Sequence, residues 1–466
     1  MKLKTVITFL YLVTSAALFL FINVELIIWI SFFINYLLIT VIAYYHLNKE
    51  KSYSPFLTSY IIFYFLFFIV APLIQISSIE SNEFLFPNYY PFDYWDVIYT
   101  NILILIFNLI FFLSYIFFKK RTLKPRVEII RKESTFFTPL IILILFIFSL
   151  FIFIYNYDYL MSVFSKANMQ EFNLSKGGVL LRKKVLFLIP LGSIVITYKY
   201  LIEKRKINSN TIILFLVLVA LLILLFIFKN PFTEKRNALG PIYITLIYLF
   251  YPKLINSNAK LFLFLFVSMI LVFPLISAIT HVNISFAEIM SNPIELYLSF
   301  VKHGGIVNTF NTLHYDAFAN IMATVEFVSN QGYSFGFQLL SAFLFFIPRS
   351  IWVSKPLSTG ELIGNYLIEE HHFGYNNLSN PIISEGYINF GLFGVLLMAI
   401  FLAYFIVKFI RWLNSGNSLK EIIAFYFAIH LMFLLRGDFT NGFVYFIGTF
   451  IGVVIIPNLI IKIFKK

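Results

Sequence analysis

Apolar segments that are long enough to cross a membrane recur from one end of this sequence to the other. Sixty per cent of the 466 residues are hydrophobic and only 12% are charged, and the mean hydropathy is +0.88. A soluble domain of this length needs a mixed, charged surface, whereas a membrane-spanning helix needs about 20 apolar residues. The sequence therefore predicts an all-α polytopic membrane protein. The expected spans, about twelve, are 5–22, 25–46, 55–77, 97–118, 136–155, 179–199, 211–229, 237–252, 260–279, 384–408, 421–435 and 442–461.

The basic residues predict how these helices are oriented. If the N-terminus is cytoplasmic, the connections on the cytoplasmic side hold most of the 35 Lys and Arg residues and few of the 22 Asp and Glu residues, as the positive-inside rule requires. We therefore expect a multi-pass protein of the cytoplasmic (inner) membrane with both termini in the cytoplasm. The first apolar segment lacks a clear cleavage site and is expected to stay as a helix. The net charge of +13 then reflects topology and not a nucleic-acid partner.

Several kinds of chemistry are excluded by the residue types. The chain has no cysteine, which rules out disulfides, thiolate zinc sites and cysteine nucleophiles. It also lacks the HExxH, DxD and P-loop patterns, so ATP hydrolysis and a metal site are not expected. No cofactor is predicted.

The predicted spans divide the chain into three parts. Residues 1–279 hold nine helices, residues 280–383 form a large extracytoplasmic loop, and residues 384–466 hold the last three helices. The loop is too apolar for a free domain, and its segment 334–347 is apolar but too short to span. We expect interfacial or re-entrant helices there.

Five cations depart from the positive-inside pattern because they fall on the predicted outer side. Buried or interfacial arginine is costly unless it is paired, and guanidinium groups bind phosphate through two hydrogen bonds. A lipid-linked phosphate or diphosphate is therefore a candidate ligand. Alternatively, each cation extends to lipid headgroups or pairs with a nearby acid. The five residues are Arg182, Arg236, Arg349, Lys355 and Arg436.

Titratable residues near the tenth predicted span are candidates for acid–base chemistry. Glu385 stands at its outer mouth, where a carboxylate is suited to deprotonate a sugar hydroxyl; the alternative is a salt bridge to an outer arginine. His371 and His372 are further candidates, but adjacent residues do not share a helix face. At most one of them is expected in a site, and an exposed pair is the alternative.

Three short runs carry a resemblance to a known family. They are Pro-Arg-Ser-x-Trp-x-x-Lys-Pro at 348–356, Glu-x-Tyr-x-Asn-x-Gly at 385–391, and LLRGDF at 434–439. The sequence resembles the O-antigen polymerase family, the Wzy-type polymerases of oligosaccharide repeat units. The runs cover about a tenth of the chain, and the plan of many helices with one late outer loop extends the likeness.

The resemblance implies a GT-C-like membrane glycosyltransferase. Such an enzyme transfers the growing glycan from undecaprenyl diphosphate to a sugar hydroxyl of the next lipid-linked unit, in O-antigen or capsule synthesis. Its partners would be the lipid-linked donor and acceptor, membrane lipids and a chain-length regulator protein. Glu385 and Arg349 would be catalytic. The residues expected to bind the diphosphate or glycan are Arg236, Arg436, Lys355, Arg182, Tyr387, Asn389, His371 and His372.

Two other functions stay open at this stage. An O-antigen ligase differs in its acceptor, and its relatives carry a histidine ahead of the tenth span, where this chain has Tyr375-Asn376-Asn377-Leu378. A flippase for lipid-linked oligosaccharides also suits twelve helices. Flippases generally lack a large outer loop, and no twofold internal repeat is visible.

Overall fold

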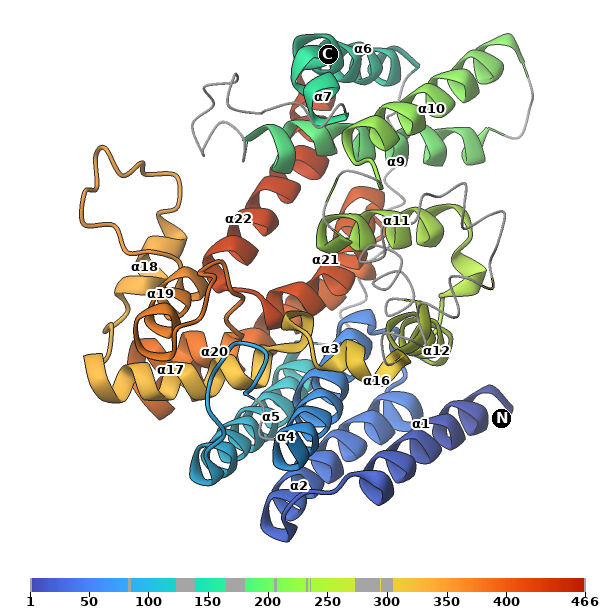
Figure 1. Ribbon diagram of the computed structural model, residues 1–466. Coiled ribbons are helices and arrows are strands. Elements are labelled where there is room, and N and C mark those ends of the chain that lie inside the picture. The colour runs from blue at the N-terminus through green and yellow to red at the C-terminus, as the bar shows by residue number, and fades with distance from the viewer. Residues whose placement is uncertain are drawn as a thin grey trace.

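The fold is known from a computed structural model in which the described residues form helices and no strands (Figure 1). The described residues are 2–82, 85–122, 139–164, 181–204, 208–231, 234, 236–272, 294 and 305–464. Among the predictions, residues 273–279 of the ninth span and most of the loop before residue 305 lie outside these ranges.

The described residues of the first half of the chain form eleven α-helices, most of them long. Three of them continue through a π-helical turn: α2 through Tyr45–Lys49, α3 through Leu66–Val70 into α4, and α12 through Ser268–Val272. The helices are α1 (Lys2–Phe21), α2 (Leu26–Tyr44), α3 (Pro55–Phe65), α4 (Ala71–Asn82), α5 (Tyr94–Thr122), α6 (Pro139–Tyr155), α7 (Tyr157–Phe164), α9 (Ile189–Glu203), α10 (Ser209–Phe228), α11 (Arg236–Phe250) and α12 (Asn258–Val267).

The second half begins with short helices and ends with long ones. In Figure 1, α17, α18 and α19 lie together at the left, beside α20, while the N-terminus lies at the opposite side. The helices are α16 (Gly305–Phe310), α17 (Ala317–Gln331), α18 (Phe337–Phe343), α19 (Thr359–His371), α20 (Ile382–Leu413), α21 (Ser418–Arg436), α22 (Phe439–Phe450) and α23 (Ile456–Ile463).

Local sequence explains where several of these helices begin. Pro55 occupies the first turn of α3, a position that needs no backbone donor. Asn208 and Thr211 cap α10 reciprocally, and the Asp438 side chain accepts from the backbone of Asn441 at the start of α22. Each cap satisfies backbone groups that the helix itself leaves unpaired.

Nine helices among the described residues are long and apolar enough to cross a membrane. A tenth candidate is the pair α6 and α7, which is bent by 62°, and the apolar helices Ala238–Phe250 and Asn258–Leu271 are shorter. The described residues therefore support nine or ten spans, and the predicted number of twelve is not confirmed. The protein is an all-helical, polytopic membrane protein.

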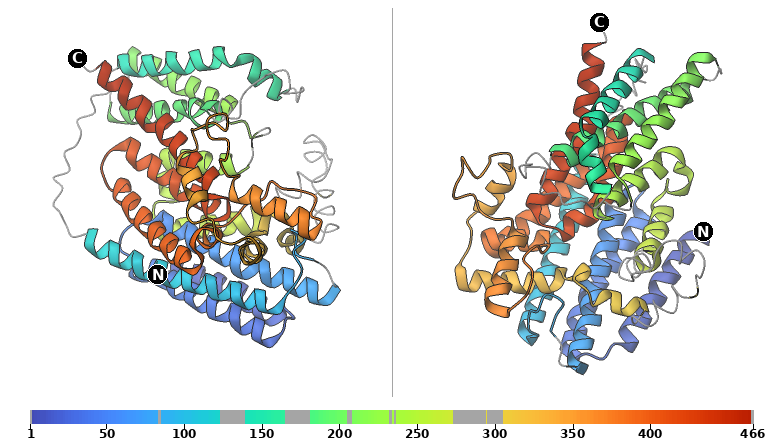
Figure 2. Two further views of the ribbon diagram at one scale, coloured as in Figure 1. Left: turned by 90° about the vertical axis from the view of Figure 1, so that its left-hand side faces the viewer. Right: turned by 45° about the horizontal axis from the view of Figure 1, so that its top comes forward.

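The most buried of the nine candidate spans is the one made by α3 and α4, in which 94% of the residues of the most apolar segment are buried. It packs on α21 and α12, and α5 packs on both α2 and α20. The Tyr60 and Phe111 rings stack with centroids 3.9 Å apart. Figure 2 shows the same bundle from two further sides.

A buried polar network joins the ends of α2, α3 and α5. Glu50 accepts a hydrogen bond from Tyr115 at 2.5 Å and pairs with Lys119. His46 lies 2.5 Å from Glu50 and 2.8 Å from the Thr58 hydroxyl. Because each charge has a partner of opposite sign, the cost of burial is offset, and we regard this network as structural.

Helix α20 is broken near its start. Phe390 and Gly391 have non-helical backbone angles, with φ of +58° at Gly391. In a straight helix, residues eight apart would be about 12 Å from each other, yet a methyl group on Gly386 would lie only 2.6 Å from the carbonyl oxygen of Gly394. The segment 382–389 therefore folds back against the continuing helix. The predicted tenth span, 384–408, is thus not one straight helix, because it is broken at Phe390 and Gly391.

Candidate functional site on the side of the outer loop

Glu385 joins three helices at the start of α20. Its side chain is buried, with 2% exposed. The Oε1 atom accepts a hydrogen bond from the backbone nitrogen of Phe439 at 2.7 Å and another from the Thr359 hydroxyl. Glu385 thus holds the first residues of α19 and α22 against α20. Within the described chain no arginine or lysine forms a salt bridge with it.

Asp438 places a second buried carboxylate beside Glu385. It caps α22, with Oδ1 accepting from the Asn441 backbone at 2.7 Å and Oδ2 from the Asn441 amide at 2.9 Å. Burial raises the pKa of Asp438, and the neighbouring hydrogen bonds partly oppose that rise. The helix N-terminus favours negative charge, so the start of α22 attracts both carboxylates.

Tyr387 and Asn389 belong to the same turn. The Tyr387 hydroxyl lies 3.2 Å from the Tyr99 hydroxyl of α5. Asn389 is fully buried and donates to the Glu385 carbonyl oxygen at 2.7 Å. Their positions explain the run at 385–391 as a structural unit, in which polar residues and Gly391 build the fold-back of α20.

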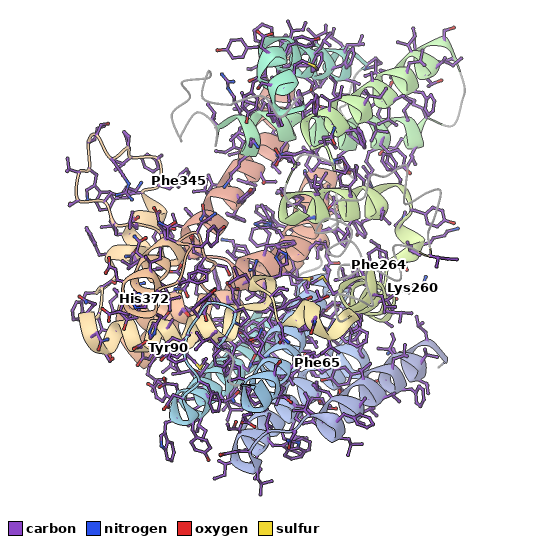
Figure 3. The ribbon with its side chains drawn as sticks, viewed as in Figure 1. Phe65, Tyr90, Lys260, Phe264, Phe345 and His372 are labelled. Atoms are coloured by element: carbon purple, nitrogen blue, oxygen red, sulfur yellow. The ribbon has the colours of Figure 1, made fainter. Side chains whose placement is uncertain are left out.

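Arg349 and Lys355 shape the segment between α18 and α19. The Arg349 guanidinium donates to the carbonyls of Lys355 and Pro356, the latter at 2.9 Å. The Lys355 ammonium donates to the carbonyls of Leu344, Phe345 and Ile347 at 3.0–3.1 Å. Burial and the neighbouring Arg349 lower the pKa of Lys355. Figure 3 shows Phe345 on this segment.

Arg436, at the end of α21, is tied to the outer loop. Its guanidinium donates to the Leu313 carbonyl at 2.6 Å and pairs with Asp316 at 3.1 Å. Asp316 also accepts from the Ser379 hydroxyl at 3.1 Å. The predicted alternative, pairing with a nearby acid, describes Arg436 in this structure.

The two histidines have different surroundings, and they do not form an exposed pair. His371 lies 3.0 Å from Glu326 of α17, and its ring is 5.3 Å from that of Tyr90. His372 is exposed and ends α19 in a left-handed conformation with φ of 55°. In Figure 3, His372 and Tyr90 lie in the same part of the molecule, far from Lys260 of α12.

A basic group lies where α9 begins and α10 ends. The Arg182 guanidinium is 5.4 Å from the centre of the Tyr159 ring, and Lys183 pairs with Glu234 at 2.9 Å. Lys229 donates to the Lys183 carbonyl at 2.5 Å. Arg236 begins α11 near this group, but its side chain lies outside the described residues. The described contacts therefore place the other four predicted cations in separate groups, with Arg182 in this group, Arg349 and Lys355 between α18 and α19, and Arg436 beside Asp316.

Lys184 is a residue that sequence reasoning missed, since its neighbours Arg182 and Lys183 suggest a simple headgroup contact. It is only 5% exposed, and its Nζ lies 3.4 Å from the centre of the Tyr445 ring. That ring is 5.6 Å from His430 of α21, whose nitrogens have no hydrogen-bond partner among the described residues. The burial of Lys184 depends on Gly448, because a methyl group there would lie 2.9 Å from the Lys184 Cβ.

The arrangement offers two chemical features on the side of the outer loop. Buried carboxylates meet at the start of α22, and cations gather just before α9, which packs on α21 and on the π-helical turn Ile451–Ile455 that follows α22. A group of cations is suited to bind an anion such as a phosphate. No protein-family model matches this sequence, and searches of curated proteins and of solved structures give no match either.

Proposed function

We propose that this protein is a membrane glycosyltransferase that polymerises lipid-linked oligosaccharide repeat units. It transfers the growing glycan from undecaprenyl diphosphate to a sugar hydroxyl of the next unit, on the outer face of the cytoplasmic membrane. The proposal extends the resemblance of three short runs to the O-antigen polymerases.

One observation carries the proposal: two of the three runs meet at Glu385. This residue belongs to the run 385–391 and contacts Phe439 at the end of the run 434–439, and it also contacts Thr359, three residues after the end of the run 348–356. Segments that only shared a composition would have no reason to converge. Their contact supports the idea that they form one functional unit.

The proposed reaction needs no ATP because the donor already carries a good leaving group. The acceptor hydroxyl attacks the anomeric carbon and gives its proton to a general base, for which Glu385 is the candidate. The bond to the diphosphate breaks with the electron pair staying on the lipid diphosphate. Cations stabilise this growing charge. We assign that role to Arg182, with Arg236 added from the sequence, since the described contacts of the other cations are to carbonyls or to acids: Arg349 and Lys355 to carbonyls, Lys183 to Glu234 and Arg436 to Asp316.

Deleting the gene in its native strain tests the proposed function through the glycan on the cell surface. Loss of a polymerase leaves single repeat units there, while loss of a flippase leaves none. Loss of a ligase leaves long chains on the lipid carrier. If long chains remained on the surface, or if all repeat units disappeared from it, the proposal would be wrong.

A further inference from the structure

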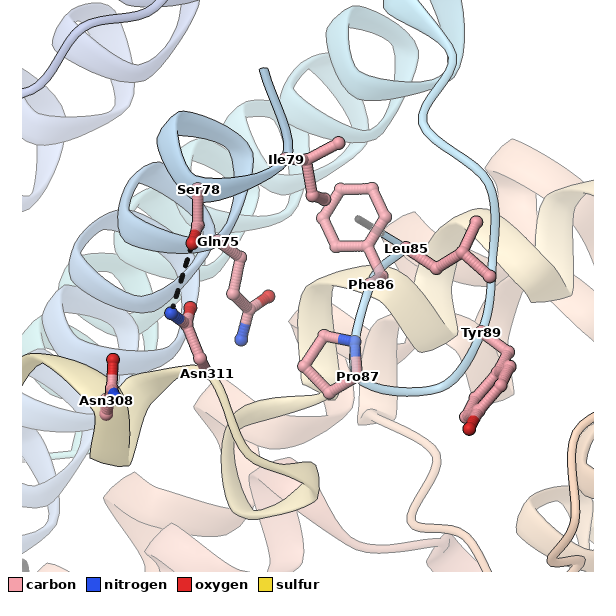
Figure 4. A pocket seen from close by; sticks show the side chains of 9 residues that line it. All are labelled: Gln75, Ser78, Ile79, Leu85, Phe86, Pro87, Tyr89, Asn308 and Asn311. Atoms are coloured by element: carbon pink, nitrogen blue, oxygen red, sulfur yellow. Dashed lines mark hydrogen bonds between the residues drawn. The ribbon is translucent and has the colours of Figure 1, made fainter. Parts of the chain in front are cut away.

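A cavity of about 690 Å³ opens between the end of α4, the segment 85–89 and α16 (Figure 4). It lies at the predicted outer end of the third span, and Glu385 is not among the residues that line it. None of the described residues that line it is charged. Three side-chain amides and a serine hydroxyl form its polar wall, and two aromatic rings form part of its apolar wall. These six residues are Gln75, Ser78, Asn308, Asn311, Phe86 and Tyr89.

Gln75 brings an unpaired acceptor to this cavity. Its side chain is 2% exposed, and its amide nitrogen donates to the carbonyls of Phe310 at 2.7 Å and Tyr315 at 3.1 Å. The other atom of the amide, Oε1, has no hydrogen-bond partner among the described residues. Figure 4 shows the Gln75 amide pointing into the cavity. A buried carbonyl without a donor is costly, so a hydrogen-bond donor on a ligand would stabilise this atom.

Asn311 presents a second acceptor of the same kind. Its amide nitrogen donates to the Ser78 hydroxyl at 3.5 Å, the dashed line in Figure 4. The Oδ1 atom is buried and has no partner in the described part of the chain. Two carbonyl oxygens from distant segments of the chain are therefore left to accept hydrogen bonds from a ligand.

The Tyr89 ring stands at the rim of the cavity because of a strained turn. Tyr89 has φ of 64°, a left-handed conformation that costs an L-residue about 1–2 kcal/mol. Its backbone nitrogen donates to the Phe86 carbonyl at 2.8 Å, and Asn88 fixes the turn by donating to Asn320 at 2.8 Å. Strain that is held in this way is concentrated at binding and catalytic sites.

We propose that this cavity binds an uncharged saccharide unit. Sugar hydroxyls donate to Gln75 Oε1 and Asn311 Oδ1, and the apolar face of the sugar ring packs on Tyr89. A few placed polar groups among aromatic walls is the usual composition of a small-molecule site. An acidic ligand finds no cation among the described lining residues. The choice of a saccharide rests on the proposed function. It adds a glycan-binding site that neither Glu385 nor Asp438 lines.

Photo-crosslinking in living cells of the native strain tests this site with the glycan that the cell makes. p-Benzoylphenylalanine is placed in the full chain at position 89 or, as a control, at the exposed Val353. After irradiation, the denatured protein is stained for sugars by periodate oxidation and hydrazide labelling. We expect a sugar-positive adduct at position 89 and a much weaker one at 353. Equal adducts, no adduct at 89, or an adduct that contains only protein would overturn the proposal.

A second variant tests the acceptor atoms. Asn311→Leu in the position-89 background is expected to reduce the adduct about tenfold, the effect of one lost hydrogen bond, at an unchanged level of membrane protein. Asn365→Leu is the matched control. Asn365 of α19 also uses its amide oxygen as an acceptor, from Asn376, but it does not line the cavity. An adduct of unchanged strength with Asn311→Leu would contradict the assignment of Asn311 Oδ1 as an acceptor for the sugar. Crosslinking measures binding in the cavity, whereas gene deletion measures polymerisation. A negative crosslinking result would therefore overturn the glycan site without overturning the proposed function, and a negative deletion result would overturn the function without overturning the crosslink.

Discussion

At the scale of single residues, the hydrogen bonds of Glu385 show a structural role that its residue type alone does not reveal. The sequence predicts a general base at the mouth of a helix. In the structure the Oε1 atom already accepts from Thr359 and Phe439, and the side chain is buried. These contacts make Glu385 a positioning residue that assembles α19, α20 and α22, while its role as a base stays a prediction.

Glu385→Gln and Glu385→Ala separate positioning from base catalysis. Glutamine keeps an acceptor oxygen for Thr359 and Phe439, so we expect chain growth to persist in part. Alanine leaves two donors unpaired, which costs about 1–3 kcal/mol for each, and we expect a lower melting temperature and no chain growth. The measurements are glycan length on gels and melting of the purified protein. A well-folded glutamine variant that is as inactive as the alanine variant would establish the carboxylate as the base.

Arg349 is the second residue whose substitution is informative. Its guanidinium reaches two adjacent carbonyls, those of Lys355 and Pro356, a geometry that lysine does not reproduce. We expect both Arg349→Ala and Arg349→Lys to abolish long glycan chains while the protein level in membranes holds. Arg121→Ala, at an exposed arginine near the predicted cytoplasmic end of α5, is the control. Long chains in the lysine variant would show that charge alone is sufficient.

At the scale of elements, the fold-back of α20 sets the geometry of the site. It brings Glu385 next to α22 and α19, and it requires glycine at two kinds of position. Gly391 has positive φ, and Gly386 and Gly394 are in backbone contact. The run 385–391 therefore combines a turn that only glycine adopts easily with polar residues that pair within it.

Gly386→Ala tests the fold-back. The added methyl group would lie 2.6 Å from the Gly394 carbonyl oxygen, and backbone cannot yield as a side chain can. We expect a loss of about 1–3 kcal/mol of stability, seen as a lower melting temperature in detergent. Gly374→Ala is the matched control, because a methyl group at that position would have no atom within 4 Å. Equal melting temperatures for the two variants would contradict the contact.

At the scale of the whole molecule, one end of the bundle gathers the outer loop and the candidate site. Helices α17 to α19 pack beside the start of α20 (Figure 1), and Arg436 of α21 pairs with Asp316. This end is the one that the distribution of Lys and Arg residues predicts to be extracytoplasmic. Both termini would then face the cytoplasm.

Cysteine labelling tests this orientation without background, because the chain has no cysteine. In intact cells a membrane-impermeant maleimide is expected to label Val353→Cys, on the segment before α19, and to leave Ser415→Cys unlabelled until the cells are opened. Both positions are exposed in the structure. The opposite labelling pattern would invert the topology and move the site to the cytoplasmic side.

The sequence alone determined the helical, membrane-embedded class of this protein, because partition into lipid depends on local runs of apolar residues. It also singled out the runs at 348–356, 385–391 and 434–439, although not their contacts. Only the tertiary structure decided that Glu385 accepts from the first residue of α22, that Lys184 is buried, and that Gln75 lines a cavity with an oxygen that has no partner among the described residues. Each of these depends on which distant segments come into contact, and the apolar pattern of a helix contains little information about its neighbours.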